Sequence, residues 1–106
     1  MSSQDRSLEG LLQRRLDLVA NLSALTAQQH KRIQEMSALE MDVLRLELEL
    51  ARDPGKDELV RELHDIDDRA AAMRSSQAEC LEATEMAEAE VEAIDRLIAA
   101  ARGGYS

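Results

Sequence analysis

Apolar residues recur along the first half of the chain with the seven-residue period of a coiled-coil helix. The leucines of residues 43–50 alternate with charged residues as a half-buried strand would, but leucine and glutamate favour helix and the seven-residue period continues through this stretch. We therefore predict one helix over about residues 5–52. Its apolar face, the first seam, comprises Leu8, Leu11, Arg15, Leu18, Leu22, Leu25, Gln29, Arg32, Met36, Leu39, Val43, Leu46 and Leu50.

The second half of the chain has the same spacing and predicts a second helix over about residues 57–102, followed by a short tail at 103–106. Its apolar face, the second seam, comprises Leu59, Leu63, Ile66, Ala70, Met73, Gln77, Cys80, Thr84, Ala87, Val91, Ile94, Ile98 and Ala101. A turn at 53–57 separates the helices, with Asp53 as the expected N-cap, Pro54 as the first helical residue and Gly55 allowing a sharp bend. Gly103 and Gly104 are expected to end the second helix.

The two seams match each other when the chain folds back on itself, because residues whose numbers add up to 109 then meet in pairs. Leu46 faces Leu63 and Leu18 faces Val91 in this register. The fold class is therefore all-α: a long antiparallel two-helix coiled-coil hairpin, forming one domain over residues 1–106. A polar layer interrupts the seams and comprises Gln29, Arg32, Gln77 and Cys80. We interpret it as a layer that sets the register, with a binding pocket as the alternative.

Apolar residues also occur outside the seams, and we call these the surplus apolar residues. They comprise Leu12, Leu16, Val19, Ile33, Met41, Leu44, Leu48, Leu81 and Met86, with Ala93 and Leu97 also off the second seam. Met41, Leu44 and Leu48 are predicted to lie opposite Leu46. An isolated hairpin buries each seam on one side only, so these residues are interpreted as an interface, in a homodimeric four-helix bundle or with another helical protein. The alternative is scattered surface residues without a role.

Composition supports a helical protein and limits its partners. Phe and Trp are absent, so Leu, Ile, Val, Met and Ala must form the core. The formal net charge of −9 argues against direct nucleic-acid or membrane binding. No apolar run is long enough for a membrane span, and the first residues, MSSQDRS, do not resemble a signal peptide. The expected location is cytoplasmic, which a lone cysteine fits.

The pattern of reactive side chains predicts no catalytic, cofactor or metal site. His64 with Asp67 and Asp68 would be a weak metal site at best, and Cys80 lies at a seam position, where a cysteine is usually a small buried residue. An acidic stripe on the second helix resembles a solvated face more than acid–base machinery. It comprises Glu79, Glu82, Glu85, Glu88, Glu92 and Asp95. We therefore expect a protein that is not an enzyme.

Three functional interpretations remain open. The first is a helical interaction module, such as an adaptor, chaperone or assembly factor, that uses the surplus apolar residues. The second comes from Asp53, Asp57 and Glu58 at the turn, which are similar to the acidic tips of secondary-channel transcription factors; that resemblance implies carboxylates directed at a polymerase magnesium, whereas helix capping explains the same residues. The third is an acidic mimic of nucleic acid built on the acidic stripe, whose binding would weaken with salt.

Overall fold

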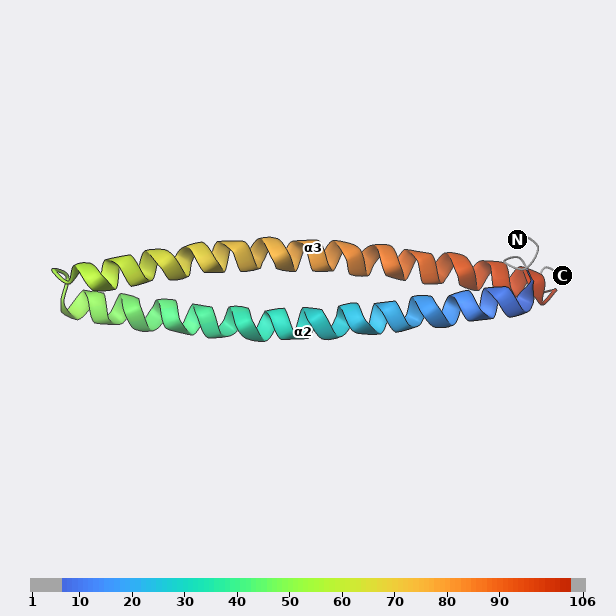
Figure 1. Ribbon diagram of the computed structural model, residues 1–106, viewed down its shortest axis with the longest axis horizontal. Helices are drawn as coiled ribbons and strands as arrows, with labels where there is room; N and C mark the ends of the chain where they lie inside the picture. The colour runs from blue at the N-terminus through green and yellow to red at the C-terminus, as the bar shows by residue number, and fades with distance from the viewer. Residues whose placement is uncertain (1–6, 104–106) are drawn as a thin grey trace. The chain divides into compact units, whose positions relative to one another are not determined.

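The computed structural model describes residues 7–103 and shows two long helices joined by a short turn (Figure 1). Helix α2 spans Leu8–Arg52 and helix α3 spans Asp57–Ala101, and the two run antiparallel as a helical hairpin. The all-α hairpin is thus confirmed. The first described helix begins at Leu8; the predicted start near residue 5 and the part of the tail after Gly103 lie outside the described residues.

Helix α2 begins at Leu8 because Ser7 caps it. The Ser7 Oγ accepts a hydrogen bond from the backbone N–H of Gly10 at 3.1 Å, and the Ser7 carbonyl accepts one from Leu11 at 2.9 Å. The hydroxyl therefore satisfies a donor that has no partner within the first turn of a helix.

The turn between the helices differs from the prediction at Asp53, which is not the N-cap of α3. The backbone N–H of Lys56 donates to the Asp53 carbonyl at 3.2 Å, which closes a four-residue turn before the helix begins. The Lys56 carbonyl then accepts from Leu59 and Val60, so Lys56 occupies the N-cap position. Pro54 belongs to the turn rather than to the first turn of α3, because the helix starts only at Asp57.

Helix α3 ends at Ala101, and Gly103, one of the two glycines predicted to end it, follows two residues later; Gly104 lies outside the described residues. The backbone N–H of Gly103 donates to the Ala100 carbonyl at 3.0 Å, and Gly103 adopts a φ of 81°. A left-handed residue just after the last turn is a common helix terminator, and glycine adopts it without a steric penalty.

The described chain forms two compact units. Within the described residues, unit 1 comprises 7–27 and 81–103, and unit 2 comprises 28–80, including the turn. Within unit 1, Leu11 and Leu18 cluster with Ile94 and Ile98, and Val91 packs against them. These contacts agree with the predicted pairing of residues whose numbers add up to 109.

Burial follows the predicted seams closely. Every buried side chain among residues 7–103 occupies a seam position, and Leu46 is the most enclosed, with 1% of its surface exposed. Most other seam positions are half-buried, and three are exposed, namely Leu8, Arg15 and Ala101. Leu8 and Ala101 lie at the helix ends, where neighbouring turns cover them less, and Arg15 turns outward to an ion pair described below.

Candidate interaction surface

The surplus apolar residues lie on the surface of the described chain, with one exception. Val19 is half-buried, and the other eight interface candidates are exposed, from 40% at Leu12 to 67% at Met41. Leu97 is also exposed, whereas Ala93 is too small to add much apolar surface. Sequence reasoning missed Val60, which is 49% exposed although it directly follows the buried Leu59. An apolar residue next to a seam position in a helix is the signal that could have identified it.

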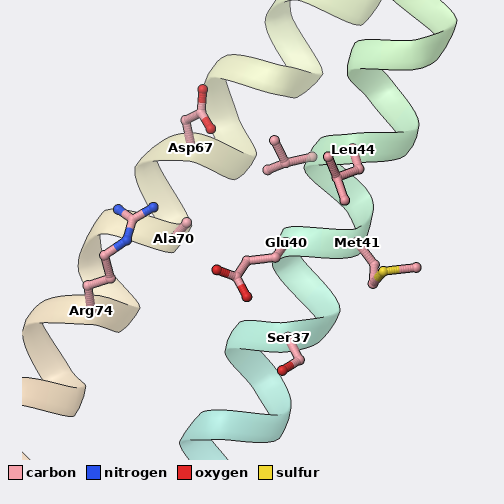
Figure 2. Close-up of a pocket in the computed structure, with 8 residues that line it drawn as sticks. Ser37, Glu40, Met41, Leu44, Asp67, Ala70 and Arg74 are labelled. Carbon is pink, nitrogen blue, oxygen red and sulfur yellow. The ribbon is translucent and has the colours of Figure 1, made fainter.

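Unit 2 gathers some of these residues around a groove of about 580 Å³ between α2 and α3 (Figure 2). Its lining comprises Ser37, Glu40, Met41, Val43 and Leu44 from α2, and Asp67, Ala70 and Arg74 from α3. Figure 2 shows Glu40 directed toward α3 and Met41 directed away from it. Leu44 therefore lies at a wall of the groove, beside the seam. The sequence pattern had predicted a position fully opposite Leu46.

The groove continues along the same side of unit 2. A second hollow of about 340 Å³ is lined by Ile33, Met36 and Gln77 and shares Ser37, Glu40 and Arg74 with the first. We call the two hollows together the unit 2 groove. Ala70, with 2% of its surface exposed, contributes only a methyl group to the floor, so the facing side chains of α2 leave open space above it. The structure thus brings Ile33, Met41 and Leu44 to one surface.

The remaining interface candidates are not part of this groove. Leu12 lines a separate hollow of about 390 Å³ in unit 1, together with Arg15, Asp95 and Ile98. None of these three hollows is lined by the other candidates, Leu16, Val19, Leu48, Leu81 and Met86. Leu48 nevertheless lies one helical turn beyond Leu44.

Charged residues of unit 1 pair across the two helices. Arg15 Nε donates to Asp95 Oδ1 at 2.5 Å, and Arg14 contacts Glu90 at 3.4 Å. The hydrogen bond and the charge of Asp95 raise the pKa of Arg15 above its ordinary value. Any stabilisation from this raised pKa is present at neutral pH and is lost only as the pH rises through it. Asp95 therefore forms an ion pair across the helices in addition to belonging to the acidic stripe, and sequence reasoning missed this pair.

Charged residues of the unit 2 groove are arranged differently. Glu40, Asp67 and Arg74 are all exposed, and none of them takes part in an ion pair within residues 7–103. The groove therefore presents two carboxylates and one guanidinium that are available to a binding partner.

The polar layer belongs to unit 2, and its residues are buried or half-buried, as seam positions are expected to be. Cys80 is buried, and Gln29, Arg32 and Gln77 are half-buried. Arg32 Nε is enclosed and lacks a hydrogen-bond partner within the described chain. A nearby hollow of about 350 Å³ is lined by Gln28, Lys31, Arg32 and Glu35 of α2 and does not include Gln77 or Cys80. The layer as a whole thus does not line that hollow.

The acidic residues at the turn are all exposed, and two of them have a local structural role. Asp57 and Glu58 occupy the first turn of α3, where negative charge is favourable beside the helix N-terminus. The other members of the acidic stripe, Glu79 to Glu92, are exposed as predicted.

The considered metal ligands do not come together. His64 Nε2 lies 3.9 Å from Asp68 Oδ2 one helical turn away, while Asp67 lines the unit 2 groove. Within the part of the chain that the structure describes, no group of three His, Cys, Asp or Glu side chains is arranged to hold a metal ion. Neither described helix has a stretch sufficiently long and apolar to cross a membrane.

Comparison with known proteins adds no relative. No protein-family model matches the chain, and the searches of curated proteins and of solved structures find no significant match.

Proposed function

We propose that this protein is a non-enzymatic helical interaction module, acting as an adaptor, chaperone or assembly factor through coiled-coil and apolar helix-face contacts. The observation that carries the proposal is the unit 2 groove, where Ile33, Met41 and Leu44 remain 49–67% exposed although the seams have already supplied the core. Apolar side chains collected at one groove and rimmed by charges are typical of a surface that binds another protein.

Self-association is part of this proposal. A hairpin covers each helix on one side only, and a second layer of helices is the usual way to cover the other side. A homodimeric four-helix bundle would bury part of the exposed apolar surface. Another helical protein could cover the same surface in an assembled complex.

The test places two charges on the exposed leucines of α2 in the variant Leu44→Glu with Leu48→Glu. Both residues are more than half exposed, so the helical circular-dichroism signal should persist. Self-association should weaken, because a carboxylate buried at an interface without a partner costs several kcal/mol. The matched control is Gln34→Glu with Ala38→Glu, which adds the same two carboxylates to exposed α2 positions outside the groove lining.

Sedimentation equilibrium would separate the outcomes. Weaker assembly of the leucine variant alone supports the proposal. Unchanged assembly in both variants, with helicity intact, would show that the Leu44 and Leu48 face of α2 makes no contact with a second chain. Loss of helicity in the leucine variant would show that these residues belong to the fold itself, which also contradicts the proposal.

A further inference from the structure

The first hollow of the unit 2 groove, which Met41 and Leu44 line, carries opposite charges at its two ends. Asp67 and Arg74 are two helical turns apart on α3, so they lie on the same face of that helix. Ala70 lies between them on the groove floor. Both charged side chains are exposed, and neither has an ion-pair partner within residues 7–103.

The two ends also differ on helix α2, in the size and polarity of the side chains there. Ser37 and Leu44 are also two helical turns apart, with Glu40 and Met41 between them. Figure 2 shows Ser37 at the end of the first hollow where Arg74 lies, and Leu44 at the end where Asp67 lies. One end therefore offers a small hydroxyl and a positive charge, and the other a large apolar side chain and a negative charge.

We propose that the occupant of the unit 2 groove is a second copy of this chain, related by a two-fold axis that crosses the helices at the level of Glu40 and Ala70. This inference rests on the proposed function and specifies its self-association. The axis exchanges the two ends of the first hollow, so α2 packs antiparallel on α2 of the second copy and α3 on α3. Each end then meets its complement, because a two-fold interface brings residue i to residue j and residue j to residue i.

The contacts that result are complementary in both charge and size. Asp67 meets Arg74 of the second copy, and symmetry forms this ion pair twice. Ser37 meets Leu44 of the second copy, so a small side chain lies opposite a large one. The axis also brings the Glu40 carboxylates of the two copies to the same level. Arg74 of the second copy comes within about one helical turn of Glu40, and its positive charge offsets this like-charge contact.

A two-fold axis parallel to the helices gives a poorer match. It would pack α2 on α3 of the second copy at the same level, and Leu44 would then cover Asp67. Covering a carboxylate with an apolar side chain removes its hydration without supplying a partner. Charge complementarity therefore selects the axis that crosses the helices.

Charge reversal provides the test. Asp67→Arg and Arg74→Asp each place like charges together twice, and each should weaken self-association about tenfold or more at low salt. The double variant Asp67→Arg with Arg74→Asp should restore association, because its groove again has opposite charges at its two ends. An equimolar mixture of the two single variants should form heterodimers in preference to either homodimer.

Two control variants separate this local effect from a change in net charge. Glu62→Arg and Arg61→Asp make the same charge changes at exposed α3 positions outside the groove lining, and association should stay close to that of the unchanged protein. Equal weakening by the controls, or a double variant as weak as the singles, would overturn the arrangement. A monomeric mass of the unchanged protein at micromolar concentration would overturn it too.

Crosslinking tests the register independently, in a Cys80→Ala background. A mixture of Ser37→Cys and Leu44→Cys chains should form a disulfide between the two variants. Neither variant should form one alone, since identical residues would lie two helical turns apart, beyond the roughly 7 Å limit for Cα atoms. Disulfides that form equally within each variant alone would refute the register.

These results distinguish the inference from the proposed function. If charges at Leu44 and Leu48 weaken assembly but charge reversal at Asp67 and Arg74 does not, the interaction module remains supported and the two-fold arrangement is contradicted. Assembly that responds to neither set removes both.

Discussion

At the scale of single residues, Gly55 and Gly103 occupy backbone positions with opposite requirements. Gly55 has no positive φ, and a Cβ atom added to it would meet no atom within 4 Å. We expect Gly55→Ala to raise the free energy of unfolding by about 0.4–1 kcal/mol, because alanine restricts the unfolded chain without straining the turn. Urea unfolding followed by circular dichroism measures the change.

Gly103→Ala is the matched control for this substitution. The φ of 81° at Gly103 lies in the left-handed region, where a Cβ atom costs roughly 1–2 kcal/mol. The same chemical change should therefore destabilise the protein at residue 103. Destabilisation by Gly55→Ala would mean that the turn needs the conformational freedom of glycine after all.

Ser7 provides a second prediction at this scale. Its hydroxyl accepts the Gly10 N–H, and Ser7→Ala removes that acceptor. The free energy of unfolding should fall by about 1 kcal/mol, within the range measured for N-cap residues. Ser7→Asp keeps an acceptor at the helix N-terminus and should retain most of the stability in the same unfolding experiment. Equal losses in both variants would argue against capping.

At the scale of the helices, the alternating leucines of residues 43–50 separate into two environments. Leu46 is 1% exposed, while Leu44 and Leu48 are 61% and 54% exposed. Leu46→Ala should therefore lower the free energy of unfolding by about 2–5 kcal/mol or abolish the helical signal. Leu97→Ala removes the same atoms from a side chain that is 54% exposed, and should change stability by less than about 0.5 kcal/mol. Similar losses in both variants would contradict the seam assignment.

The helices and their core could be predicted because both depend on a periodic pattern. Pro54 and Gly55 marked the turn, and the seam spacing identified Leu46, Ala70 and Ile98 as core positions, all of which are buried. Burial within a helix pair depends mainly on which face a residue occupies, and the face follows directly from the residue number.

Other features could not be derived from the period, because they depend on side-chain volume and on local hydrogen bonds. The groove is open where Ala70 contributes only a methyl group, and the pairing of Arg15 with Asp95 depends on how far two side chains reach across the helices. The residue types at the turn suggested Asp53 as the cap, but the Lys56 N–H donates to the Asp53 carbonyl and the helix starts only at Asp57.

At the scale of the whole molecule, the balance between buried and exposed apolar side chains governs stability. Seam residues such as Val43, Leu63 and Ile66 are only half-buried, and large apolar side chains remain exposed in both units. A two-helix hairpin of this kind gains little net free energy from its own core, because conformational entropy offsets most of the burial. The proposed second copy would supply the missing burial, so folding and association should be coupled.

Coupled folding and association make stability depend on protein concentration. The thermal midpoint of the helical signal should rise over a hundredfold increase in concentration, because mass action favours the associated and folded state. The Leu44→Glu with Leu48→Glu variant should show a lower midpoint and a weaker dependence, while the Gln34→Glu with Ala38→Glu control should follow the unchanged protein. A midpoint that is constant across this range would show that the hairpin is stable alone. The exposed groove would then need a different helical protein to cover it.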